Sequence, residues 1–75
     1  AALLAQVERG LRSDPQRGDL LLARAQLLEQ TGDERAALTA YERAAAVPDA
    51  ANDALAGQVR MLTALRRFAE AERLL

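Results

Sequence analysis

The sequence predicts a single all-α domain over residues 1–75, and three observations indicate it: composition, the placement of helix breakers and the spacing of apolar residues. Alanine occurs eighteen times and leucine fourteen times, whereas valine, isoleucine and threonine together occur six times. Helices favour Ala, Leu, Arg, Glu and Gln, while sheets favour β-branched and aromatic side chains. We therefore expect helices only, packed around a core of leucine and alanine.

Proline and glycine divide the chain into five segments. Proline ends a preceding helix and glycine permits the left-handed residue that closes one. The strong breakers are Asp14-Pro15, Thr31-Gly32-Asp33 and Val47-Pro48-Asp49, and a weaker turn is inferred at Arg66-Arg67. The predicted helices cover 1–13, 16–30, 34–47, 51–65 and 67–75. Connections this short place consecutive helices antiparallel and side by side.

Apolar residues recur at helical spacing in the three central segments, which places one apolar stripe on a single face of each helix. The predicted stripes are Leu21, Ala25 and Leu28 in the second segment, Ala37, Leu38, Tyr41, Ala44 and Ala45 in the third, and Leu55, Val59 and Leu62 in the fourth. We expect Tyr41 to pack in the core rather than to stack on a ligand.

Two aspartates are placed where helix N-caps are expected. Asp33 precedes the third helical segment, and its carboxylate can accept from exposed amide groups of the first turn. Asp14 precedes Pro15, a residue that is favoured at the first position of a helix.

Residue classes and turns repeat along the chain at a fixed interval of about 34 residues, the period of one class of helical repeat. Leu21 and Leu55 are separated by this interval, as are Asp19 and Asp53. A pair of helices with this period is the signature of one repeat architecture. An ordinary bundle has no reason to keep its turn residues at a fixed interval.

The segment from Asp19 to Asp49 resembles a tetratricopeptide repeat. That family has a bulky residue, Leu-Gly and an aromatic on its first helix, then small, aromatic and small residues on its second, closed by proline. Gly32-Asp33 matches the tight turn, Pro48 lies one residue early, and Arg24 stands where the family has leucine. The remaining positions of the pattern are matched by Leu21, Ala25, Leu28, Ala37, Tyr41 and Ala44.

The resemblance divides the domain into a partial repeat at 1–15, a full repeat at 18–50 and a partial repeat at 51–75. It implies antiparallel helix-turn-helix repeats stacked as a short right-handed α-solenoid. It further implies a protein–protein interaction scaffold that binds a peptide or protein segment on its concave face. The alternative fold is an unrelated five-helix bundle with similar spacing.

Composition and charge argue against several other functions. Without Cys, His or Lys, the chain has no disulfide, ordinary zinc site, catalytic thiol, imidazole or phosphate-binding lysine. Glu70 and Glu72 lie at i and i+2, so they point to different helix faces and cannot act as a catalytic pair. We expect no enzymatic activity, no catalytic residues, no cofactor and no metal.

Charge and hydropathy also restrict the partners. Ten arginines against eleven acidic residues leave a net charge of −1, which provides no overall positive field for nucleic acid. No apolar run approaches the roughly 20 residues needed to cross a bilayer, so we expect no membrane insertion. Glu8, Arg9 and Arg12 interrupt the first apolar stretch, so it does not resemble a signal peptide. The absence of cysteine fits cytoplasm and periplasm equally.

The candidate partner-binding residues come from the resemblance, because first helices of successive repeats line the family's groove. Beside the predicted core stripes lie Asp19, Leu22, Gln26 and Glu29 on the second segment, and Asp53, Ala56, Arg60 and Thr63 on the fourth. Together they offer the apolar side chains of Leu22 and Ala56, the amide of Gln26, and the opposite charges of Glu29 and Arg60. The alternative is that Arg60 only pairs with Glu29 or Asp53 across the helices.

Two other roles stay open. The chain could be a structural spacer or oligomerisation segment of a larger bacterial assembly, secretion or envelope protein. It could also be an accessory domain fused to an enzyme or a secretion system, on which its function would depend. We expect self-association through the terminal helices, because Leu3, Leu4 and Val7 at one end and Leu74-Leu75 at the other lack the polar cap of a native array.

Overall fold

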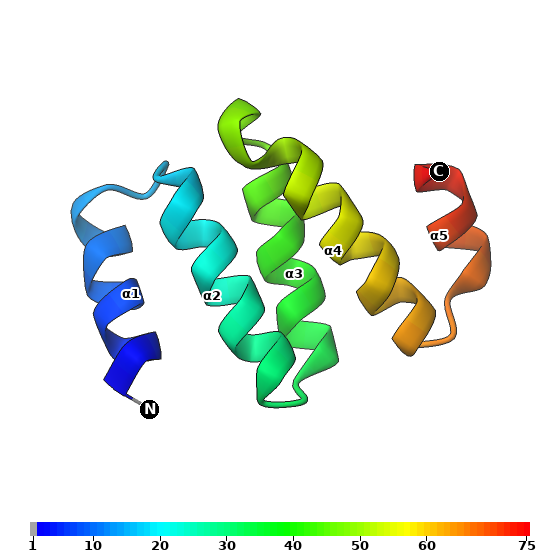
Figure 1. Cartoon of the computed structure of the whole chain (residues 1–75), viewed down its shortest axis with the longest axis horizontal. Helices are drawn as coiled ribbons and strands as arrows, with labels where there is room; N and C mark the ends of the chain where they lie inside the picture. Colours follow the sequence, from blue (N-terminus) through cyan, green and yellow to red (C-terminus); the bar gives the residue numbers. More distant parts are fainter. Residues whose placement is uncertain (1) are drawn as a thin grey trace.

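The computed structural model describes residues 2–75, which form five α-helices and a short 3-10 helix without any strand (Figure 1). The α-helices are α1 (Ala2–Ser13), α2 (Gly18–Gln30), α3 (Glu34–Ala45), α4 (Ala51–Ala64) and α5 (Phe68–Leu74), and the 3-10 helix η1 (Pro48–Ala50) precedes α4. The all-α prediction is confirmed. Each α-helix lies inside one of the five predicted segments, because breakers and caps act locally.

Consecutive helices run antiparallel and pack side by side in chain order (Figure 1). α2 contacts both α3 and α4, and α3 contacts α4. Three mutually touching helices cannot lie in one plane, so α3 is displaced from the plane of α2 and α4. The Cα atoms extend over 36 × 26 × 13 Å, whereas one flat layer of helices would be only about 5 Å deep at the Cα atoms. α2 and α4 therefore run in the same direction as neighbours.

The core is centred on α2, α3 and α4. The predicted stripes of the second and third segments are confirmed, because one buried cluster contains Leu21, Ala25, Ala37, Tyr41 and Ala44, with Leu28 packed against it. The alanines matter because small side chains let two helix axes approach closely. The terminal helices bury little, with Leu11 the buried residue of α1 and Ala71 that of α5.

The predicted stripe of the fourth segment is partly wrong. Leu62 is buried, but Val59 is only half-buried and Leu55 is 38% exposed. The face of α4 that meets the core instead comprises Ala54, Gly57, Gln58, Met61 and Leu62. Periodicity alone could not distinguish the two stripes, because both have helical spacing and the rotation of α4 is set by its contact with α3.

That rotation is fixed by a close approach between Gly57 and Tyr41. The Tyr41 ring is 1% exposed and is the largest fully buried side chain in the described chain. A Cβ atom added to Gly57 would overlap the ring carbons of Tyr41. The backbone of α4 therefore lies directly against the ring, which only glycine allows.

The turns that close α2 and α4 have the same hydrogen-bond pattern. At the end of α2, the Asp33 amide donates to the Leu28 carbonyl and the Gly32 amide donates to the Glu29 carbonyl, both at 3.1 Å. At the end of α4, Arg67 donates to Leu62 at 2.8 Å and Arg66 to Thr63 at 3.0 Å. Both are Schellman motifs. They are separated by the interval read from the sequence, which therefore recurs in the backbone.

The left-handed residue differs between the two turns. Gly32 has φ of 84°, and Arg66 adopts a φ of 62° in the corresponding place. A left-handed conformation costs a residue with a Cβ atom roughly 1–2 kcal/mol. The Arg66 guanidinium lies 5.7 Å from the centre of the Phe68 ring, a contact that offsets part of this cost.

One of the two predicted N-caps is confirmed. The Asp33 carboxylate accepts from the Ala36 amide at 3.2 Å. Asp14 does not cap a helix, because α2 begins only at Gly18. Its carboxylate accepts from the Gln16 amide at 3.2 Å and closes a local turn around Pro15. An aspartate before proline favours either arrangement.

Substituting Gly57 by alanine tests the close approach. Helix propensity alone would raise the free energy of unfolding by about 1 kcal/mol. Overlap with the Tyr41 ring should outweigh that gain and lower it by about 1–3 kcal/mol. Urea denaturation followed by circular dichroism measures the difference, with the exposed Thr63→Ala on the same helix as control. A more stable Gly57→Ala protein would contradict the packing.

The two Schellman turns give a pair of substitutions with opposite signs. Gly32→Ala should lower the free energy of unfolding by about 1 kcal/mol, because alanine is strained at positive φ. Arg66→Gly should raise the free energy of unfolding by less than about 1 kcal/mol, because loss of the contact with Phe68 cancels part of the gain from the relieved strain. Chemical denaturation of both variants checks the signs. Changes of the same sign would show that the turns are not equivalent.

Candidate functional site

The eight candidate residues lie along two neighbouring helices that run in the same direction. Leu22 and Glu29 are half-buried, and the others are exposed: Asp19, Gln26, Asp53, Ala56, Arg60 and Thr63. The structure does not gather all eight around one hollow. They fall into a group at each end of the surface, with Gln26, Asp53 and Ala56 exposed outside both groups.

The strongest cluster joins Glu29 of α2, Tyr41 of α3 and Arg60 of α4. The Tyr41 hydroxyl donates to Glu29 Oε1 at 2.6 Å. Arg60 donates to both carboxylate oxygens of Glu29, from Nε and Nη2 at 3.2 Å each, and Nη2 also donates to the Tyr41 hydroxyl at 3.2 Å. Three helices are therefore connected by one polar network at the surface of the core.

The network fixes the ionisation of its members. The hydrogen bond from Arg60, followed by that from Tyr41, holds the pKa of the Glu29 carboxyl below its ordinary value. Burial, followed by the hydrogen bond to Glu29, raises the pKa of the Tyr41 hydroxyl. At neutral pH, Glu29 is charged and Tyr41 is neutral. Neither group titrates near neutrality, where a general acid or base works best.

An open and mostly apolar hollow of about 590 Å³ adjoins this network. It is lined by Glu29, Glu34, Val59, Arg60, Met61, Thr63 and Ala64. Arg60 remains 52% exposed although its guanidinium pairs with Glu29. The hollow therefore offers an apolar surface, the Thr63 hydroxyl and the free side of a guanidinium.

The second group lies at the other end of α2. Asp19 and Leu22 line a hollow of about 460 Å³ together with residues 16–18 and with Val47, Asp49 and Ala50. Asp19 is held by Arg17, whose Nη2 lies 2.6 Å from Oδ2, and this hydrogen bond lowers the pKa of Asp19. Asp19 and Glu29 are separated by about 15 Å along the helix. A partner that contacts both groups must therefore follow the length of α2.

The described chain contains neither a metal-binding cluster nor a membrane-spanning helix. Within residues 2–75, no group of three or more acidic side chains is placed to hold a metal ion. No helix in this range has both the length and the apolar character required to span a membrane.

Sequence reasoning assigned Tyr41 to the core alone and overlooked its hydroxyl. The signal was available, because a buried tyrosine normally finds a hydrogen-bond partner for its hydroxyl. It also overlooked four lining residues of the hollow, Glu34, Val59, Met61 and Ala64. No sequence signal identifies them, because the hollow depends on how α4 meets the turn after α2.

No protein-family model matches the sequence, no curated protein matches it, and no solved structure matches the fold at a significant level.

Acidification should weaken the contribution of Arg60. Because the pKa of Glu29 is depressed in the folded protein, the stabilisation is fully present above the ordinary glutamate pKa of about 4.3. It is lost as the pH falls through the lower folded value. Arg60→Gln should cost up to about 1 kcal/mol at neutral pH, and almost nothing once Glu29 is protonated.

Urea denaturation of wild type and Arg60→Gln at a series of pH values measures this difference. Arg35→Gln serves as the control, because Arg35 is exposed and no carboxylate among residues 2–75 lies within ion-pair distance of it. If the difference in free energy of unfolding between wild type and Arg60→Gln stays constant on acidification, the assigned ion pair is contradicted.

Proposed function

We propose that the chain is a protein–protein interaction module of the tetratricopeptide-repeat type. In this proposal, α1 to α5 form a short right-handed α-solenoid, and its concave face binds a peptide or protein segment across α2 and α4. The module does not act as an enzyme.

Two observations support the repeat architecture. The Schellman turns closing α2 and α4 have the same hydrogen bonds, one sequence repeat apart. α2 contacts α4 directly while α3 packs against both, which is the arrangement expected when first helices of successive units line one face.

The observation that carries the binding role is the hollow beside the Glu29–Tyr41–Arg60 network. Its walls are mostly apolar, and Arg60 presents a half-exposed guanidinium already oriented by Glu29. Apolar area with a few fixed polar groups suits a protein segment. The shifted pKa values of Glu29 and Tyr41 favour binding over acid–base chemistry.

A structural or oligomerisation role is the second candidate, and the terminal helices favour it. Leu3 is 62% exposed at one end, and Phe68 is 50% exposed at the other. Together with the exposed Leu74 and Leu75, they leave apolar surface on both terminal helices.

Photo-crosslinking in cells that express the protein distinguishes the two roles. A photoreactive amino acid replaces Gln26 on the proposed binding face, or Leu3 on the outer side of α1. Crosslinks from position 26 to one defined segment of another protein support the module. Crosslinks from position 3 to a second copy, with none from position 26, support oligomerisation.

The segment identified from position 26 then allows a quantitative test. Thr63→Arg places a bulky side chain at the hollow and should weaken binding by about tenfold, or roughly 1.4 kcal/mol. Thr39→Arg makes the same change at an exposed threonine of α3 outside this hollow, and it should leave the affinity unchanged. Equal effects of both substitutions would remove the hollow from the binding surface.

A further inference from the structure

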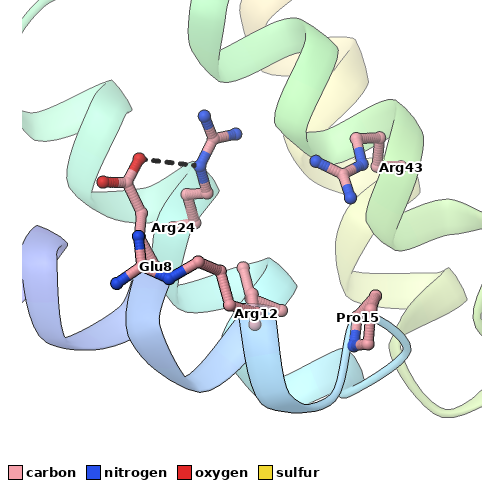
Figure 2. A pocket seen from close by; sticks show the side chains of 6 residues that line it. Glu8, Arg12, Pro15, Arg24 and Arg43 are labelled. Carbon is pink, nitrogen blue, oxygen red and sulfur yellow. Dashed lines mark ion pairs between the residues drawn. The ribbon is translucent and has the colours of Figure 1, made fainter.

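A second hollow lies between α1, α2 and α3, away from the proposed binding face. Its volume is about 480 Å³, and it is lined by Glu8, Leu11, Arg12, Pro15, Arg24 and Arg43. Figure 2 shows Arg12 from α1, Arg24 from α2 and Arg43 from α3 around it. Arg24 and Glu29 are five residues apart, which places them about 140° apart around the α2 axis. This arginine hollow and the network of Arg60 therefore face different directions.

The arginine hollow concentrates positive charge in an otherwise slightly acidic chain. Three arginines and one glutamate give its lining a net charge of +2, against −1 for the whole chain. Glu8 lies 3.5 Å from Arg24 and is the acidic residue of the lining (Figure 2). Among residues 2–75, no carboxylate lies within ion-pair distance of Arg12 or Arg43. The charges of Arg12 and Arg43 are therefore uncompensated within the described chain.

The equivalent hollow one repeat later has the opposite charge. Between α3, α4 and α5, a space of about 290 Å³ is lined by Glu42, Gln58, Leu62, Glu70, Arg73 and Leu74. Glu42 and Gln58 lie one repeat interval after Glu8 and Arg24, so the two hollows correspond in the repeat. The later one has two glutamates and one arginine, a net charge of −1. The positive charge is therefore a property of these particular side chains and not of the repeat geometry.

Arginines that line one hollow with fewer counter-charges than positive charges repel one another. An anion placed among them removes this repulsion, and guanidinium groups bind carboxylates through paired N–H donors. Leu11 and Pro15 add apolar surface beside the arginines, which can contact the aliphatic part of an acidic side chain. Nucleic acid is disfavoured, because its affinity requires many phosphate contacts and the net charge of the chain is negative.

We propose that the arginine hollow binds carboxylate side chains of an acidic protein segment, with Arg12 and Arg43 as the principal donors. Arg24, held by Glu8, lies beside them. The site is separate from the face across α2 and α4. A substitution that abolishes binding at one surface should therefore leave binding at the other intact.

Fluorescence anisotropy with a labelled peptide of alternating glutamate and alanine tests the proposal on the full chain. The peptide is acetylated and amidated, so that only side chains supply carboxylates, and the same peptide with glutamine is the reference. We expect the glutamate peptide alone to bind. Arg12→Gln/Arg43→Gln should weaken its binding by at least about tenfold. Arg35→Gln/Arg73→Gln removes the same charge elsewhere and should change the affinity by less than about twofold.

Two results would overturn the proposal. Equal binding of the two peptides would show that the carboxylates are not recognised. Equal weakening by the two double variants would show that only the net charge of the protein matters. Competition at equal ionic strength separates the sources of negative charge. Glutarate, a dicarboxylate with a charge close to that of inorganic phosphate, should displace the peptide at least as well as phosphate. Displacement by phosphate at much lower concentration than glutarate would exclude a carboxylate site.

Thermal unfolding followed by circular dichroism checks that each variant is folded. If Arg12→Gln/Arg43→Gln is not folded, Arg12→Lys/Arg43→Lys retains the charge but loses the paired donors. It should weaken binding of the glutamate peptide severalfold. Wild-type affinity in the lysine variant would contradict the assignment of Arg12 and Arg43 as paired donors.

Discussion

The contact between the Tyr41 ring and the backbone at Gly57 determines much of the rest of the structure. It sets the distance and rotation between α3 and α4, and the rotation decides which residues of α4 face the core. At the tip of the same side chain, the Tyr41 hydroxyl forms hydrogen bonds with Glu29 and Arg60, so Tyr41 connects the core to the surface. A phenylalanine would fill the same space but leave the surface network without its central group.

Alanine and leucine make a core whose stability is unevenly distributed. Small side chains bury little area each, so stability depends on how many neighbours a helix has. α3 packs between α2 and α4, whereas α1 and α5 each contact one neighbouring helix. Local opening should therefore begin at the ends, while the central three helices stay ordered. The Glu29–Tyr41–Arg60 network lies on that ordered centre.

Charged side chains give the two sides of the molecule different character. Beside α2 and α4, Arg60 is compensated by Glu29, so the adjoining hollow is mostly apolar and oriented by fixed polar groups. Between α1, α2 and α3, no carboxylate among residues 2–75 pairs with Arg12 or Arg43, and the hollow is basic. The corresponding space between α3, α4 and α5 has a net charge of −1 in its lining, so exchanging a few side chains is enough to reverse the charge.

The sequence by itself determined the helices, their order and most of the core that α2 and α3 contribute. Breakers, caps and apolar spacing act within a few residues, so Gly32, Asp33, Ala37 and Tyr41 could be placed without tertiary information. Only the tertiary structure decided that Leu55 is exposed, that Glu29, Tyr41 and Arg60 meet, and that Arg12 and Arg43 share a hollow. These features depend on how far each helix is rotated about its axis and how closely it approaches its neighbour. That is settled by packing such as Tyr41 against Gly57, between residues distant in sequence.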